Sequence, residues 1–61
     1  METIYIKGNR IDFEFVKYSK DYNYKQYFEA WLVEGIRYIE RLYLGQFSSK
    51  QEMITVLEGV L

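Results

Sequence analysis

The stretch KQYFEAWLVEGIRYIERLYL, residues 25–44, decides the fold, because its pattern fits two different secondary structures. As a helix, it gathers its aromatic and aliphatic side chains on one broad face, with Glu29, Arg37, Glu40 and Arg41 opposite. As two strands, it forms a hairpin that turns around residues 34–36. Length and the apolar arc favour the helix, whereas aromatic and β-branched residues and a central glycine favour strands. The pattern alone therefore leaves both structures open.

In the hairpin interpretation, side chains alternate between two faces of the sheet. One face carries Phe28, Ala30, Leu32, Tyr38 and Leu42. The other face carries Tyr27, Glu29, Trp31, Val33, Arg37, Ile39, Arg41 and Tyr43. A turn at residues 34–36 predicts that Glu29 pairs with Arg41 across the two strands.

The N-terminal part of the chain predicts a second hairpin. Residues 2–7 and 10–17 are rich in Ile, Phe and Tyr, and Gly8-Asn9 between them tolerates the positive φ of a tight turn. We expect Lys7 to pair with Arg10, so that Ile6 faces Ile11 and Ile4 faces Phe13 on one side together with Phe15. The other side of this hairpin then carries Tyr5, Asp12 and Glu14. Residues 18–24 have no period and are interpreted as a connection.

A helix is predicted over residues 49–60. Ser49 and Glu52 have the spacing of a capping box, which satisfies free N–H groups at a helix start. The apolar residues then recur at helical spacing and predict the stripe that packs on the sheet, which comprises Met53, Val56, Leu57 and Val60.

Residues 26–56 resemble a known pattern that favours strands for the ambiguous stretch. Phe28-Glu29-Ala30-Trp31-Leu32 is followed, ten residues after Leu32, by Leu42 and then by Tyr43-Leu44-Gly45-Gln46-Phe47-Ser48-Ser49, with an acidic residue at 52. This arrangement resembles the ethylene-response-factor DNA-binding domain of plants and the integrase arm-type domains of mobile elements. The resemblance implies an antiparallel sheet packed on one helix, with strand residues of the opposite face in the major groove of DNA.

By this resemblance, Arg41 stands where the family has a basic residue and Tyr43 where it has an aromatic one. Trp31 and Val33 occupy positions where the family has a charged residue and an arginine. The arginine cluster of the family's first strand has no counterpart, since residues 18–24 offer only Lys20. We therefore expect an α+β fold, a small antiparallel sheet of three to four strands on one C-terminal helix. The alternative is an N-terminal hairpin followed by two helices.

Composition limits the chemistry of this chain. Its 61 residues suffice for a single domain, 1–61, with one thin core. The sequence has no Cys and no His, which excludes disulfides, thiolate metal sites and the commonest general base. Eight basic and nine acidic residues give a net charge of −1, which provides no global field for a polyanion. We expect no enzyme, no cofactor and no metal site.

Three other features are interpreted as structural. Asp12 and Glu14 alternate on one strand face, a spacing that usually marks plain surface rather than paired catalytic carboxylates. Gly8-Asn9 and Gly45 do not open a helix beside a lysine, as phosphate-binding loops do. The chain lacks an apolar run long enough to span a bilayer and lacks a secretory signal, so we expect a cytoplasmic location and no membrane partner.

Aromatic residues make up 20% of the chain, and they are the side chains that dominate protein interfaces. The first hypothesis is a small regulatory or inhibitory protein, similar in style to phage and mobile-element accessory proteins. It would bind a partner protein or a second copy of itself through one sheet face, with Tyr27, Trp31, Arg37, Ile39, Arg41 and Tyr43. The alternative is a sequence-specific DNA-binding module that uses Lys25, Arg37, Arg41 and Tyr43.

Overall fold

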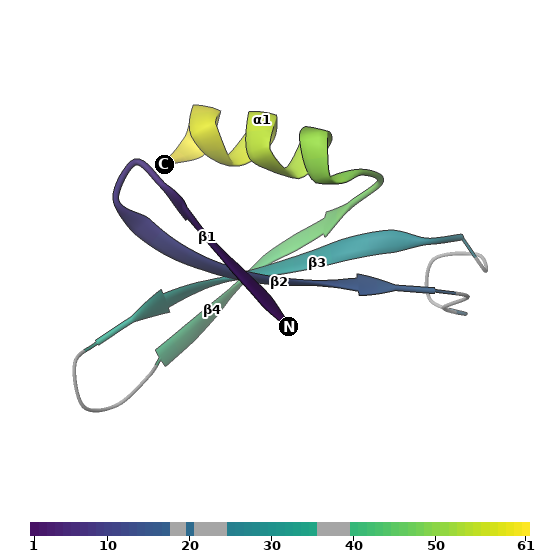
Figure 1. Cartoon of the computed structure of the whole chain (residues 1–61), viewed down its shortest axis with the longest axis horizontal. Helices are drawn as coiled ribbons and strands as arrows, with labels where there is room; N and C mark the ends of the chain where they lie inside the picture. Colours follow the sequence, from purple (N-terminus) through teal and green to yellow (C-terminus); the bar gives the residue numbers. More distant parts are fainter. Residues whose placement is uncertain (18–19, 21–24, 36–39) are drawn as a thin grey trace.

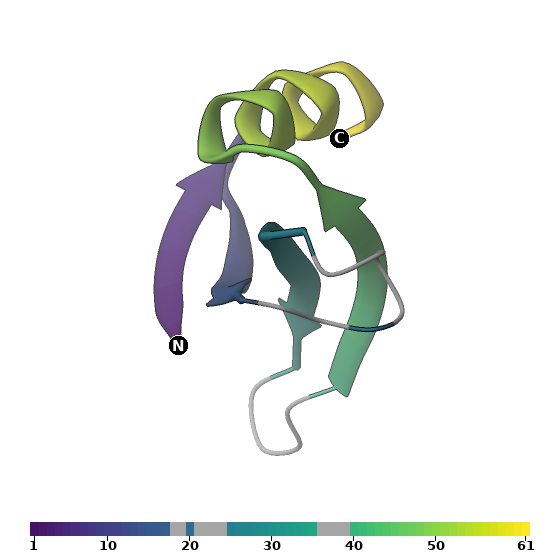
Figure 2. The same ribbon diagram turned by 90° about the vertical axis from the view of Figure 1, so that its right-hand side faces the viewer.

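The computed structural model describes residues 1–17, 20, 25–35 and 40–61. These residues form four strands and one helix, namely β1 (Glu2–Ile6), β2 (Asn9–Val16), β3 (Tyr27–Glu34), β4 (Glu40–Phe47) and α1 (Lys50–Val60). The strands form one antiparallel sheet in the order β1-β2-β3-β4. The helix crosses one face of the twisted sheet (Figures 1 and 2). This confirms the predicted α+β fold, and the helical alternative for the ambiguous stretch is wrong in its described residues.

The hydrophobic core lies between α1 and the sheet. Strands β2 and β3 contribute alternate residues, since every second side chain of a strand points to the same face, and β1 and β4 contribute one buried residue each. The helix contributes Met53 and Leu57, one turn apart. The buried core cluster comprises Ile6, Ile11, Phe13, Ala30, Leu32, Phe47, Met53 and Leu57.

The N-terminal hairpin differs in register from the prediction. Ile4 pairs with Ile11 and Ile6 pairs with Asn9, whereas we expected Ile4 to pair with Phe13. The turn is formed by Lys7 and Gly8, both with positive φ (51° and 80°), and not by Gly8-Asn9. Two positive values of φ match the mirror-image turns that hairpins favour. Each residue of β1 pairs with the β2 residue two positions before the expected one. Because a shift by two residues preserves the alternation, each side chain stays on its predicted face.

The side chain of Asn9 explains why the turn lies one residue earlier than predicted. Its Nδ2 donates to the carbonyl oxygens of Ile6 at 3.2 Å and Lys7 at 3.5 Å. Asn9 therefore closes the turn from the first position of β2 and leaves the positive φ to Lys7. The prediction had placed Asn9 inside the turn, as one of its two residues with positive φ.

The register of β3 and β4 also differs from the prediction. Glu29 pairs with Gln46, and Arg41 pairs with Val33, not with Glu29. A register shift between Ala30 and Trp31 adds one residue to β4, and Gly45 beside it has φ of 125°. The predicted turn at 34–36 was too early, because β3 continues through Glu34 and β4 begins at Glu40. Residues 36–39 lie outside the described residues.

Gly45 is a site where backbone strain alone can be tested. Nothing lies within 4 Å of where a Cβ would stand, so a methyl group has room. A φ of 125° is nevertheless costly for any L-residue. We expect Gly45→Ala to destabilise the fold by about 1–3 kcal/mol in urea unfolding, and D-alanine at the same position to restore most of the loss. An unchanged unfolding midpoint for Gly45→Ala would contradict this account.

The helix begins as predicted but buries a different stripe. Ser49 is the N-cap, and its hydroxyl accepts from the amide of Glu52 at 3.0 Å. The carboxylate of Glu52 reaches Ser48, accepting from its amide and its hydroxyl, both at 2.6 Å. Val56 and Val60 are exposed, and Ile54 and Leu61 pack against the core in their place. The prediction for the two valines was wrong, because the helix is rotated toward its Met53–Leu57 line.

Candidate interaction site

We call the sheet face away from α1 the open face. No described helix or strand packs on it, and the pairing of the strands defines its rows. The residues on this face are Thr3, Tyr5, Arg10, Asp12, Glu14, Val16, Tyr27, Glu29, Trp31, Val33, Arg41, Tyr43 and Gln46. Tyr5 is 70% exposed and Tyr43 is 49% exposed. These side chains thus form a mixed aromatic and charged surface.

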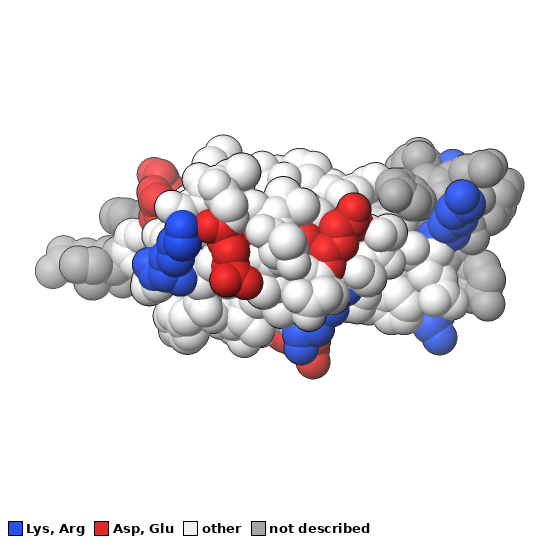
Figure 3. All heavy atoms as spheres, turned by 90° about the horizontal axis from the view of Figure 1, so that it is seen from above, with Lys and Arg blue, Asp and Glu red and all other residues white. Residues whose placement is uncertain are grey.

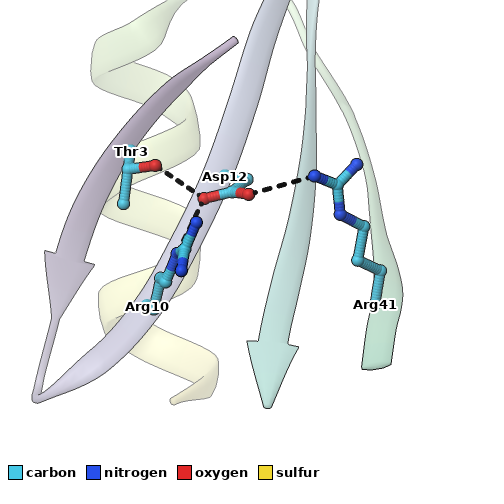
Figure 4. A network of polar contacts seen from close by, with 4 residues as sticks. All are labelled: Thr3, Arg10, Asp12 and Arg41. Atoms are coloured by element: carbon cyan, nitrogen blue, oxygen red, sulfur yellow. Dashed lines mark hydrogen bonds and ion pairs between the residues drawn. The ribbon is translucent and has the colours of Figure 1, made fainter. Parts of the chain in front are cut away.

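A buried carboxylate organises one end of the open face. Asp12 is 3% exposed, although the sequence had placed it on plain surface, a prediction that the structure corrects. Its Oδ1 accepts from Thr3 Oγ1 at 2.7 Å and from Arg10 Nε at 3.2 Å, and its Oδ2 accepts from Arg41 Nη2 at 3.4 Å (Figure 4). The hydrogen bond from Thr3 is the largest cause that lowers the pKa of Asp12, and the two guanidinium groups add to it against the effect of burial.

Arg10 and Arg41 therefore lie on either side of one carboxylate, from strands β2 and β4. Their side chains are 42% and 47% exposed, so each guanidinium also faces solvent. One negative charge against two positive ones leaves this end of the face cationic. We call Arg10, Asp12 and Arg41 the arginine end.

Two aromatic rings occupy the centre of the open face. Trp31 and Tyr43 are direct cross-strand neighbours, and their ring centroids lie 5.8 Å apart at an interplanar angle of 59°. Cross-strand aromatic pairs of this kind stabilise a sheet and present flat apolar surface. Trp31 is half-buried, so part of its ring remains accessible.

The opposite end of the face is acidic. Glu14 and Glu29 are direct cross-strand neighbours, and like charges in such pairs repel. The Oε1 of Glu29 accepts from the Tyr43 hydroxyl at 3.2 Å and from Gln46 Nε2 at 3.4 Å. Desolvation and the nearby Glu29 carboxylate raise the pKa of Tyr43. We call Glu14 and Glu29 the glutamate end.

The structure brings together only some of the predicted interface residues. Trp31, Arg41 and Tyr43 lie side by side on the open face. Tyr27 shares that face but is 4% exposed, so its ring is not part of the accessible surface. Val33 is also buried there. Predicted residues Arg37 and Ile39 lie outside the described residues.

For the DNA alternative, the described cations are Lys25, just before β3, and Arg41. Arg41 is paired with Asp12, and the glutamate end lies on the same face as both arginines. A phosphate backbone would meet carboxylates as well as cations there. On the face seen from the helix side, the described basic and acidic side chains are interspersed, and some of them lie next to one another (Figure 3).

Thr3, Arg10 and Asp12 were not predicted as site residues, although Asp12 was placed on this side of the N-terminal hairpin. Arg10 and Asp12 are two residues apart on β2, so their shared face was a usable signal. Thr3 needed the correct hairpin register, and the contact between Arg41 and Asp12 joins residues 29 apart in the chain. No sequence signal predicts that last contact.

A concave surface lies between the helix and β1, which is at the edge of the sheet. It is an open groove of about 440 Å³ lined by Ile4, Tyr5, Ile6, Lys7, Lys50, Ile54 and Glu58. Lys50 Nζ lies 5.4 Å from the centroid of the Phe13 ring, so this lysine partly covers the core. The groove holds two lysines and one carboxylate but no buried polar group that would orient a small ligand.

Comparison with known proteins gave no relative for this chain. No protein-family model, no curated protein and no solved structure matches it. Its likeness to ethylene-response-factor and integrase arm-type domains therefore stays a hypothesis. In the part of the chain that the structure describes, no helix is long and apolar enough to cross a membrane. The same residues contain no group of three or more metal-ligating side chains.

Proposed function

We propose that this chain is a non-enzymatic binding protein that contacts a partner protein, or a second copy of itself, through the open face. The observation that carries the proposal is the Trp31–Tyr43 pair between two charged ends of opposite sign. Trp, Tyr and Arg are the side chains that most often dominate the binding energy of protein interfaces. A regulatory or inhibitory role, as in phage and mobile-element accessory proteins, is the form of activity that such a small domain would have.

The test is the effect of Trp31→Ala on partner capture from nuclease-treated extract. We expect Trp31→Ala to weaken binding of the captured protein by at least about 2 kcal/mol, because the ring stands at the centre of the face. Tyr43→Ala, in which a more exposed ring is lost, serves as the second variant if Trp31→Ala does not fold. Binding would be measured by titration of the captured protein after its identification.

The matched control is Val60→Ala, which removes an exposed apolar side chain from the helix instead of the sheet. Full binding by folded Trp31→Ala and Tyr43→Ala variants would contradict the proposal. If the captured partner is lost on nuclease treatment, and if Arg41→Ala abolishes binding in a salt-dependent manner, the DNA-binding alternative replaces it. Nucleic-acid binding is the weaker proposal because the glutamate end shares the face with the arginines.

A further inference from the structure

We infer that the open face docks on the open face of a second copy of this chain, as a symmetric dimer centred on Trp31 and Tyr43. The inference rests on the proposed function, because it names the partner of the same face. The order of charges along the strands supports self-docking.

Three successive rows of the open face carry its arginines, its Trp31–Tyr43 pair and its glutamates, and Val16 pairs with Tyr27 in a further row beyond the glutamates. The first row contains Arg10 and Arg41, the second contains Asp12, Trp31 and Tyr43, and the third contains Glu14 and Glu29. The carboxylate of the middle row is buried and already holds both arginines. The accessible charge therefore changes from positive to negative along the strand direction.

In the dimer, the two-fold axis lies between the two open faces. It runs across the strands along the middle row, so the strands of the second copy point in the reverse direction. The arginine end of each copy then lies over the glutamate end of the other, and this contact occurs twice. The aromatic rows meet at the axis. A face that is complementary to itself under a two-fold operation is what an isologous interface requires.

The glutamate end supplies a second argument. Glu14 and Glu29 repel each other across β2 and β3, and no described basic side chain forms an ion pair with either. Hydrogen bonds from Tyr43 and Gln46 reach Glu29 only. The guanidinium groups of a second copy would compensate this unpaired negative charge.

The required area is compatible with the size of the chain. A standard interface buries about 800 Å² on each partner. That is about a sixth of the 4584 Å² that the chain exposes. One face of a two-layer domain offers a surface of this extent, and its burial would thicken a small core.

Sedimentation equilibrium over a dilution series tests the dimer, with Glu14→Lys/Glu29→Lys as the decisive variant. We expect the natural chain to dimerise. The dissociation constant of the double variant's dimer should be at least about 100-fold higher, because the new lysines of each copy would lie over the arginines of the other. Raising the ionic strength from about 0.01 M to about 1 M should weaken the natural dimer and strengthen the variant dimer.

The chain offers a closely matched control. Glu34 and Glu40 are also direct cross-strand neighbours, but they lie on the helix side of the sheet. Glu34→Lys/Glu40→Lys makes the same change in charge and should leave dimerisation within about threefold of the natural chain. Circular dichroism establishes that both double variants are folded.

A covalent trap gives an independent readout. The natural sequence has no cysteine, so single cysteines can be introduced without competing thiols. Oxidised Tyr43→Cys should form a disulfide-linked dimer, since residue 43 meets its own copy near the axis, and Glu58→Cys on the helix should not.

Three results would overturn the inference. The first is a chain that is monomeric at every concentration while Trp31→Ala still impairs capture of another protein, which would leave the proposed function standing. The second is a dimer that both double variants weaken equally, or that Glu58→Cys traps as well as Tyr43→Cys. If the aromatic variants lose neither capture nor self-association, the proposed function fails together with the inference.

Discussion

Phe13→Ala is expected to leave the chain largely unfolded at 25 °C. Phe13 is 1% exposed, and it lies between α1 and the sheet with its ring centroid 6.1 Å from that of Phe28. Truncation of a buried phenylalanine costs about 3–5 kcal/mol. A domain of this size with a single core rarely has more than about 3–5 kcal/mol of stability. Far-ultraviolet circular dichroism and urea titration would measure the loss.

Phe15→Ala is the matched control for this experiment. Phe15 lies on its predicted face and stacks on Phe28 with a centroid distance of 5.0 Å, but it is 46% exposed. We expect this variant to lose only about 1 kcal/mol, since much of its ring already contacts water. A Phe13→Ala chain that unfolds cooperatively, with no greater loss than Phe15→Ala, would mean that the core lies elsewhere.

Asp12→Asn is expected to destabilise the fold by about 2–3 kcal/mol at neutral pH. The substitution keeps the shape of the side chain but removes the charge and turns one acceptor into a donor. Three donors, from Thr3, Arg10 and Arg41, then face an amide. Hydrogen bonds to a charged group contribute about 1.5–3 kcal/mol each, and the solvent exposure of both arginines limits the total loss.

The same residue sets part of the acid limit of the fold. The pKa of Asp12 is lowered in the folded state from an ordinary value of 3.8, so its contribution is present above that value. The contribution is lost as the pH falls through the lower folded-state pKa. Glu52, whose pKa is also lowered by its hydrogen bonds with Ser48, acts in the same direction.

Acid titrations of stability separate the two carboxylates. We expect Asp12→Asn to flatten the loss of stability below about pH 4. The Glu52→Gln variant should still show the loss of stability at acid pH that is caused by protonation of Asp12. If the free energy of unfolding falls with the same slope at acid pH in the natural chain and in Asp12→Asn, then Asp12 has the same pKa in the folded and the unfolded state.

Much of the fold was predictable because local signals agreed with one another. The alternation of β2 and the cap at Ser49 each indicated the element that the structure contains. The sequence pattern of residues 25–44 did not choose between helix and strand. What decides the strands is pairing, since β3 lies between β2 and β4 and bonds to both.

The errors concern one local contact at the first turn and several contacts between distant parts of the chain. The register of β1 depends on the role of Asn9, which was predicted inside the turn. Asn9 instead follows the turn and closes it by hydrogen bonds to Ile6 and Lys7. The burial of Asp12 on β2 depends on Thr3 from β1 and Arg41 from β4, so three strands have to come together. A side chain's partners across a sheet follow from register, and bulges such as that at Gly45 shift register without a strong sequence signal.

The place of Met53 and Leu57 in the core has a consequence for biosynthesis. Both are fully buried against strands that begin at residue 2, so the sheet has no partner layer until this part of the helix exists. A nascent chain that ends before Leu57 must therefore leave Ile11, Phe13 and Leu32 exposed to water. We therefore expect folding on the ribosome to be completed only after the helix has emerged, with the apolar side of the sheet prone to aggregation until then.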